Sequence, residues 1–414
     1  MNPLLRTLLV PSLLLLGTAG VVLFAKNRDE SRVRAASASD KSLAPSQEKL
    51  LELAFKAASA LPENPHAKTR GRLQADVVDA CFALDVPRRA LACTEKISDW
   101  RRGLGYADFA CYSASHGLSE EVPHYLELAQ KIAEQGEPLI TQDWQKGRIL
   151  VGIAKTHVWL GDVNAAAALE NGLEHAEMGK VDAVRALRAD SSTFDAQVSA
   201  LKHVLESGDL DLCKNAFETC AQLFNRYYDE PEKRAKVEEA VAACSPKLPI
   251  EVRIGAGIEM AGFAIEHKDS RKALELIDSV HALLDGVTWL PENYIPLAAR
   301  LAALRFRAGA KEEGRLELQH ALTRYEQERA RIVDIYRAGA LRPLAEAYAA
   351  MGEREAALAA YKRVVEEGVA NPNSRPRAED LVATCLSLAR GAVEPDEELS
   401  ARLEKVCGEL KAPW

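Results

Sequence analysis

Eight cysteines are the side chains in this sequence that could carry redox, metal or nucleophilic chemistry. They are Cys81, Cys93, Cys111, Cys213, Cys220, Cys244, Cys385 and Cys407. A zinc ribbon or a thioredoxin-like site would place two cysteines in a Cys-x-x-Cys motif, and no pair has that spacing. Most of them lie among alanine and leucine at helical spacing, which predicts small buried thiols. Many free thiols also favour a reducing compartment, because oxidising compartments promote disulfides.

The stretch Gly255-Ala256-Gly257 is the part of the sequence most similar to a dinucleotide-binding loop. Such a loop follows a strand and needs a third glycine at a fixed spacing, and this stretch has neither. We interpret these glycines as positions of close helix packing. The sequence also lacks a phosphate loop, a Gly-x-Ser-x-Gly elbow and a His-Glu-x-x-His motif. We therefore expect a non-catalytic protein with no cofactor and no metal site; an all-α enzyme with a site assembled from distant residues is the alternative.

The composition is that of a folded, mainly helical protein. The 414 residues include 61 acidic and 53 basic side chains, which gives a net charge of −8, and 48% of the residues are hydrophobic. These values exclude a disordered or collagen-like chain. Aromatic residues make up only 6%, which favours helices over strands. The acidic balance also argues against a nucleic-acid partner.

The N-terminus contains an uncharged run of 19 residues from Thr7 to Ala25, between Arg6 and Lys26. A helix of this length rises about 28 Å, close to the thickness of the hydrocarbon core of a membrane. We predict that residues 1–25 form a single-pass transmembrane anchor, with a cleavable secretory signal as the alternative. Residues 26–46 are polar and are expected to form a flexible tether, with Ser46 as the N-cap of the first helix.

The orientation of the anchor is predicted from the basic residues at its two ends. Only Arg6 precedes the segment, whereas Lys26, Arg28, Arg32 and Arg34 follow it. The excess on the C-terminal side predicts that the large domain, residues 47–414, is cytoplasmic. A periplasmic or exported domain is the alternative.

The large domain consists of amphipathic helices in repeated pairs. In the clearest unit, Ala345 on the first helix faces Ala357 on the second, and Gly352 makes the turn between them. Small residues allow two helices to cross closely, and glycine tolerates the left-handed backbone that such a turn needs. The small residues expected at the crossings of all units are Ala90, Val122, Ala166, Cys213, Ala273, Gly314 and Ala357. Lys268 and Asp85 take the turn position in two of the units.

The spacing between these small residues indicates a helical solenoid. The intervals are 32, 44, 47, 60, 41 and 43 residues, and self-similarity on this scale is typical of stacked repeats. The longest interval predicts one additional helix between Pro231 and Pro246. A last helix pair from about residue 378 is expected to cap the open end of the array.

These units resemble the tetratricopeptide repeat family, most closely over residues 344–364 and more weakly over residues 69–368. Armadillo and HEAT repeats are the structural alternative, because their periods lie nearer to the observed spacing. The resemblance implies an all-α fold, a right-handed α-solenoid of about seven to eight helix-turn-helix repeats. It also implies that the first helix of each pair lines a concave groove for a peptide or a partner helix.

The same resemblance implies a set of candidate groove residues. These are Arg148, Lys155, Trp159, Lys202, Phe306, Arg307, Arg342 and Glu346. The first three would form a cationic and aromatic patch that pairs with a carboxylate and buries an apolar side chain. Alternatively, Trp159 packs against a neighbouring repeat and the basic residues are ordinary surface.

Together these features predict a membrane-tethered scaffold or adaptor that holds an unknown protein or peptide partner in its groove. The alternatives are an exported or periplasmic repeat protein in envelope assembly and the all-α enzyme named above. The sequence does not identify the partner.

Overall fold

The computed structural model describes residues 38–136, 139–170, 172–207 and 209–414. The predicted membrane segment and most of the predicted tether lie outside these ranges. Within them the chain forms nineteen α-helices and three short 3-10 helices, and no strand. None of the described helices is both long enough and apolar enough to cross a membrane. The all-α repeat fold expected from the sequence is confirmed.

The helices follow one another with short connections. Their bounds are α1 Pro45–Ala60, α2 Glu63–Ala83, α3 Pro87–Thr94, α4 Arg101–Ser115, α5 Val122–Gln135, α6 Asp143–Leu160, α7 Val163–Glu170, α8 His175–Arg188, α9 Phe194–Glu206, α10 Leu210–Arg226, α11 Pro231–Cys244, α12 Ile250–Glu266, α13 Ser270–Asp285, α14 Pro291–Arg307, α15 Lys311–Glu328, α16 Asp334–Ala350, α17 Arg354–Val369, α18 Ser374–Arg390 and α19 Glu397–Gly408. The 3-10 helices are η1 Ser191–Thr193, η2 Ser245–Lys247 and η3 Arg329–Arg331.

Pairs of antiparallel helices are the repeating unit, as the sequence predicted. Gly352 joins α16 to α17 with a φ of 78°, and Lys268 joins α12 to α13 with a φ of 61°. At the crossing of α14 and α15, a Cβ atom on Gly314 would lie 2.8 Å from the carbonyl oxygen of Ala302, so only glycine fits there. Gly257 lies inside α12, where a Cβ atom would clash with Val280 of α13, so the predicted packing role is confirmed for this glycine. It is wrong for Gly255, where a Cβ atom would meet nothing within 4 Å.

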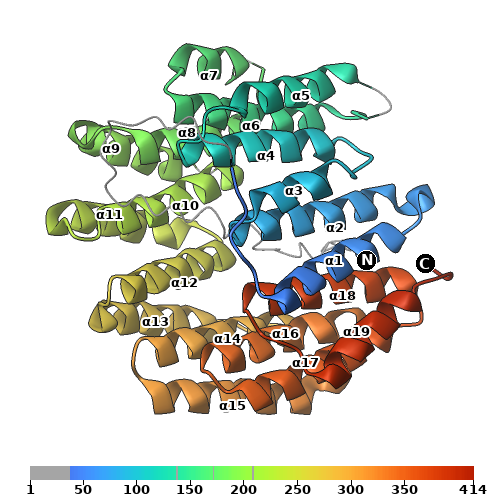
Figure 1. Ribbon diagram of the computed structural model, residues 1–414. Helices are drawn as coiled ribbons and strands as arrows, with labels where there is room; N and C mark the ends of the chain where they lie inside the picture. The colour runs from blue at the N-terminus through green and yellow to red at the C-terminus, as the bar shows by residue number, and fades with distance from the viewer. Residues whose placement is uncertain (1–37, 137–138, 171, 208) are drawn as a thin grey trace, which may run out of the picture.

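The even-numbered helices form one continuous layer. Each of them from α2 to α16 contacts the next even-numbered helix, and α18 contacts α2, so these contacts close into a ring. Figure 1 shows α5, α7, α9, α11, α13 and α15 on the outside of this ring. The helices α12, α14, α16 and α18 begin at Ile250, Pro291, Asp334 and Ser374, which are 41, 43 and 40 residues apart.

The interval of 60 residues between Cys213 and Ala273 is explained only in part by the additional helix predicted there. The predicted helix exists as α11. However, Cys213 lies on α10, which contacts α8 and α12 and therefore belongs to the inner layer, whereas the sequence analysis treated it as the second helix of its pair. The helix before it, α9, contacts α10 and α11 and lies in the outer layer. The interval to Ala273 thus spans from an inner helix to an outer one.

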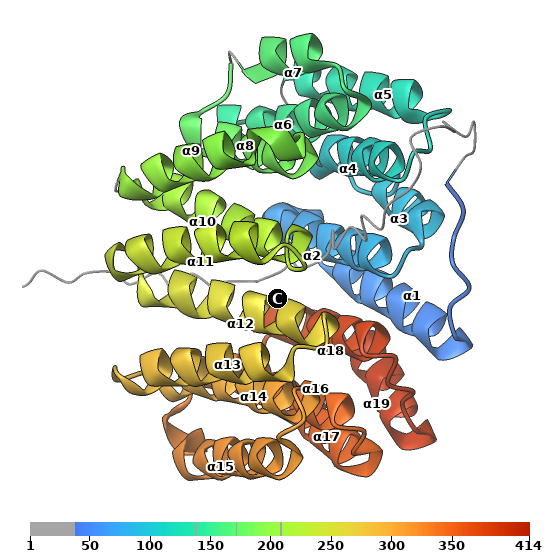
Figure 2. The same ribbon diagram turned by 90° about the vertical axis from the view of Figure 1, so that its left-hand side faces the viewer.

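The two ends of the helical array pack against each other, and this was not predicted. We call α1, α2, α18 and α19 the closure junction; both ribbon views show α1 beside α18 (Figures 1 and 2). One hydrophobic core includes Leu51 and Val77 from the N-terminal side and Leu386 and Leu403 from the C-terminal side. The last helices, expected to cap a free end, therefore contact the first ones, because the apolar faces of both ends cover each other.

Polar contacts reinforce the closure junction at its edges. The side-chain amide of Gln47 donates a hydrogen bond of 2.8 Å to the carbonyl oxygen of Ala389, 342 residues away. Arg72 on α2 donates to Glu379 on α18 at 3.1 Å. These contacts fix the register of α18 against the first two helices.

The described part of the predicted tether is packed against the fold. Asp40 accepts a hydrogen bond of 2.6 Å from the backbone nitrogen of Arg88, whose Nε donates to the carbonyl oxygen of Ala38 at 2.7 Å. Ala44, rather than Ser46, is the N-cap of the first helix, because Pro45 begins the helix and its fixed φ suits the first helical position. Residues 38–44 are therefore anchored to the start of α3 instead of forming a flexible tether.

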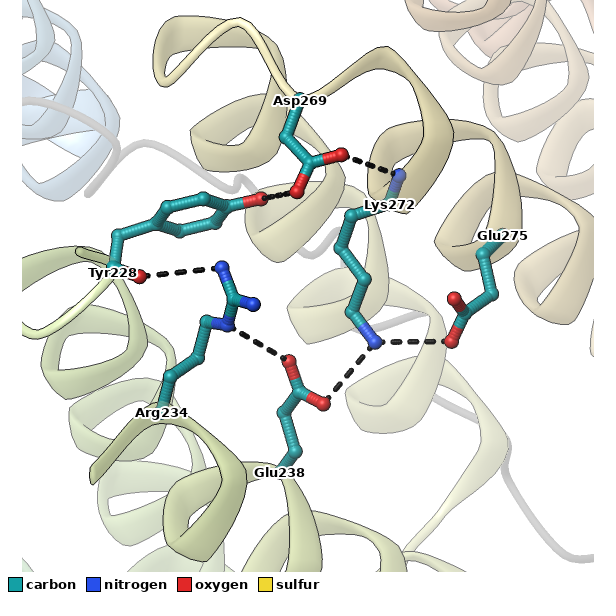
Figure 3. A network of polar contacts seen from close by, with 6 residues as sticks. All are labelled: Tyr228, Arg234, Glu238, Asp269, Lys272 and Glu275. Carbon is teal, nitrogen blue, oxygen red and sulfur yellow. Dashed lines mark hydrogen bonds and ion pairs between the residues drawn. The ribbon is translucent and has the colours of Figure 1, made fainter. Parts of the chain in front are cut away.

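A network of charged and polar groups holds adjacent units together on the opposite side of the ring (Figure 3). Tyr228 after α10 donates to Asp269 at 3.1 Å, and Asp269 caps α13 by accepting from the backbone nitrogen of Lys272 at 2.9 Å. The Lys272 ammonium reaches Glu238 of α11 at 3.1 Å and Glu275 of its own helix at 2.9 Å. The network therefore fixes the angle between the α10–α11 and α12–α13 units.

Candidate functional site

The first three predicted groove residues lie on α6, and the structure gives them different surroundings. Arg148 is exposed and lies over the ring of Trp144 at 5.2 Å. Trp159 is half-buried against the core cluster around Phe109, and Arg188 of α8 covers its ring at 5.1 Å. Trp159 thus packs against its neighbours, as in the alternative that the sequence left open.

The other predicted groove residues are dispersed over several faces. Lys202 lies on α9 in the outer layer, so it does not share a wall with Lys155. Phe306 packs at the crossing with α15, where Lys311 and Arg315 of that helix lie over its ring at 5.7 and 5.1 Å. Its neighbour Arg307 is exposed at the end of α14.

Arg342 and Glu346 remain together on α16, where they face α18. Their charged groups are 4.0 Å apart. Glu346 also accepts a hydrogen bond of 2.6 Å from Ser387, which shares a second one of 2.8 Å with the hydroxyl of Tyr361. Arg342 is also close enough to Asp380 of α18 to lower the pKa of that carboxyl, which burial raises to about 7. This pair therefore belongs to a network between two inner helices.

Several of the inner helices carry a carboxylate whose pKa is raised by burial, and we call five of these residues the inner acidic row. It consists of Asp79 on α2, Asp108 on α4, Glu218 on α10, Glu259 on α12 and Asp380 on α18. These five helices lie in the inner layer of the ring, and the charge of Asp108 acts on Asp79 while that of Glu218 acts on Glu259. The row extends from the closure junction to the opposite side of the molecule.

The surroundings of the inner acidic row favour the protonated carboxyl forms. Protein around Asp79 removes much of its hydration although the side chain remains open to solvent, and together with the nearby Asp108 this raises the pKa of Asp79 to about 8. Burial raises the pKa of Asp108 to about 6 against the opposing charge of Lys155. Burial also raises the pKa of Glu259 to about 7, although Gln222 donates a hydrogen bond to it at 2.5 Å. Burial is the largest cause in each case, and it outweighs the basic side chains nearby, such as Arg390 near Asp79 and Lys155 near Asp108.

Lys155 is a predicted groove residue whose charge acts on two carboxylates of this row. Its ammonium lowers the pKa of Asp108 on α4 and also that of Glu218 on α10, whose pKa burial raises overall. Lys155 is thus surrounded by acidic groups and does not form part of a cationic patch with Lys202. Lys180 and Lys214 also lower the pKa of Glu218, so Lys155 is one of several basic groups near the row.

Sequence reasoning missed the inner acidic row because an isolated acidic residue in an amphipathic helix usually faces solvent. The residues next to Asp79 in the sequence could have indicated its position. Asp79 is enclosed by Val78 and Ala80, and both of these are buried. A carboxylate inside an apolar stretch, repeated on several first helices, could have indicated a common inner face.

Within the described ranges, no group of three or more His, Cys, Asp or Glu side chains is arranged to hold a metal ion. Comparison with known proteins adds little: no family model matches the chain and no curated protein is similar to it. One solved structure is similar, a "Circular tandem repeat protein with novel repeat topology and enhanced subunit contact surfaces". It is 15% identical, the match covers 88% of this chain and 94% of that one, and the TM-score is 0.20. The ring is therefore defined by the contacts between the helices of this chain.

Proposed function

We propose that this protein is a non-catalytic interaction scaffold that binds a basic segment of a partner protein along its inner acidic row. The row is the observation that supports this proposal most directly. Helices separated by more than one hundred residues contribute its carboxylates, and on a common inner surface a partner's lysine or arginine side chains would find several acceptors. Bound cations would also compensate for the hydration that these carboxylates lose on burial, since a neighbouring positive charge stabilises the ionised form.

The resemblance of the sequence to tetratricopeptide repeats, which we keep as part of the proposal, implies the same binding surface. In a right-handed superhelix of this class, the first helices of successive pairs form the concave surface. The carboxylates of this chain lie on those helices, and the candidate residue Lys155 is among them. We therefore keep the groove as the binding surface and change the expected chemistry of the partner from acidic to basic.

Fluorescence anisotropy with two labelled peptides of equal length tests this proposal, one rich in lysine and one rich in glutamate. The lysine peptide should bind, and its affinity should fall as salt is added, since the contacts are ionic. The triple variant Asp79→Asn, Asp108→Asn and Glu259→Gln should lose about tenfold or more in affinity, roughly 1.4 kcal/mol. Equal binding of the two peptides would contradict the proposal.

A matched control removes the same charge from the outer layer. Glu232 and Glu239 on α11 and Glu313 on α15 are exposed carboxylates outside the inner layer. Changing all three to glutamine should leave the affinity for the lysine peptide within about twofold. A loss equal to that of the inner variant would show that only net charge matters and would contradict a specific inner surface.

We further propose that the N-terminal segment from Thr7 to Ala25 holds this scaffold at a membrane, with the ring on the cytoplasmic side. The support is the length of the uncharged run and the basic residues that follow it. Intact mass of the protein from native membranes distinguishes a retained anchor from a cleaved signal. A reporter enzyme that is active only in the periplasm, fused after Trp414, should remain inactive; strong activity would reject the cytoplasmic orientation.

A further inference from the structure

Cys81 and Cys93 lie on the two helices of the α2–α3 hairpin and face the same core. Cys81 is completely buried in the core of the closure junction, and Cys93 is half-buried and packs against that core from α3. The two thiols also lie close enough for each to shift the pKa of the other. The structure contains both as free thiols.

The surroundings of the two sulfur atoms differ in a way that assigns them different roles. The neighbouring Cys81 thiol lowers the pKa of the Cys93 thiol, and the positive charges of Lys96 and Arg89 lower it further against the effect of burial. In contrast, the neighbouring Cys93 thiol and burial raise the pKa of Cys81. Cys93 also keeps part of its surface open to solvent, whereas Cys81 is 0% exposed. Since the accessible thiolate is the reactive form of cysteine, Cys93 is the nucleophile of the pair and Cys81 is the buried thiol next to it.

We propose that Cys93 is a site of oxidation by hydroperoxides and that Cys81 resolves the oxidised form into a disulfide between α2 and α3. The Cys93 thiolate attacks one oxygen of the hydroperoxide, the O–O bond breaks, and Cys93 becomes a sulfenic acid while hydroxide or an alkoxide leaves. The sulfur of Cys81 then attacks the sulfur of Cys93 and displaces its hydroxyl group, which leaves as water with the proton from Cys81. Two thiols are oxidised and one peroxide is reduced.

The arrangement satisfies the requirements of both steps. The first step needs a thiolate that solvent can reach, and Cys93 retains part of its surface. The second step needs a thiol already adjacent to the first, so that condensation is faster than further oxidation. Cys111 on α4 provides an internal comparison, because it is also half-buried, but burial raises its pKa to about 11.

Peptide mapping of the full-length wild-type protein tests the proposal without a variant. The reduced protein is treated with a limiting amount of hydrogen peroxide near neutral pH, alkylated, digested with trypsin and analysed by mass spectrometry. We expect residues 73–88, which contain Cys81, to be linked to residues 90–96, which contain Cys93. The linkage should disappear after reduction with dithiothreitol, while Cys111 remains alkylated throughout. Recovery of Cys93 as an unlinked thiol or as a sulfinic acid would overturn the proposal.

Two further measurements test the separate roles of the sulfur atoms. Limited alkylation should label Cys93 at least about tenfold faster than Cys111, since the thiolate fraction changes tenfold per pKa unit. In the variant Cys81→Ala, the sulfenic acid of Cys93 should accumulate and react with dimedone, whereas the wild type should show little of this adduct. Equal dimedone labelling of the variant and the wild type would show that Cys81 does not resolve the intermediate and would overturn its role.

Discussion

The closure junction and the arc from α7 to α9 differ greatly in how much of each helix is buried. In the closure junction, α18 alone buries eleven of its 17 residues. In the arc, Ala166 is the buried residue of α7, Val181 that of the described part of α8, and Phe194 and Leu205 those of α9. The place where the first and last described helices meet is therefore better packed than a stretch between them.

This difference reverses the usual distribution of stability in a solenoid. In an open array, the terminal repeats have only one neighbour and fray first. Here α1 and α18 are neighbours, so neither end is free. The weakest part of the ring is expected where short helices bury few side chains, because local stability follows the number of buried apolar contacts.

Removing one large side chain from the closure junction should have the largest effect on stability. Leu51 on α1 is 1% exposed and lies in the core shared with α18. Leu51→Ala should lower the free energy of unfolding by about 2–5 kcal/mol, measured by urea denaturation, because it leaves a cavity in a tightly packed core. The control Leu210→Ala at the arc boundary, where the leucine is 55% exposed, should change it by less than about 0.5 kcal/mol. Equal losses would remove the distinction between the two regions.

Hydrogen exchange compares the same regions in the unmodified protein. Amide protons in α7, α8 and α9 should exchange on the order of 100-fold faster than those in α1 and α18, because the arc opens locally while the closure junction opens only with the whole ring. Exchange followed by peptide mass spectrometry measures this ratio directly. Comparable protection in both regions would mean that buried side chains do not determine where this ring opens.

Much of the unit structure was predictable because it is encoded locally. The turns at Gly352, Lys268 and Asp85 all have positive φ, and the helix between Pro231 and Pro246 exists. The closure junction could not be predicted in this way, because no local pattern indicates that Leu51 and Leu386 share a core. The inner acidic row depends on the same ring geometry. The sequence pattern also treated α9 as the first helix of a pair, which placed Lys202 in the inner layer instead of the outer one.

A moderate effect of pH is expected at the closure junction. Burial raises the pKa of Asp380 from 3.8 to about 7, with Arg342 opposing the rise. Its folded form therefore holds a proton that the unfolded chain loses near pH 4, so the stabilising contribution is complete below that pH and is lost as the pH rises through about 7. Urea denaturation should show lower stability at about pH 8 than at about pH 5, and Asp380→Asn should reduce this slope. A slope unchanged by the substitution would assign the pH dependence to other carboxyls.

The smallest effect is expected from the exposed ion pair of the closure junction. Lys49 on α1 and Glu404 on α19 approach to 2.5 Å, but their side chains are 64% and 49% exposed. Water solvates both charges in either state, so Lys49→Ala should not measurably shift the urea midpoint, and added salt should leave the wild-type midpoint nearly constant. The pair Lys236–Asp195 beside the arc, at 2.6 Å and similarly exposed, is the matched control. If Lys49→Ala lowered the midpoint as strongly as Leu51→Ala, the ring would be closed by charge, and the contrast in apolar burial would not explain its stability.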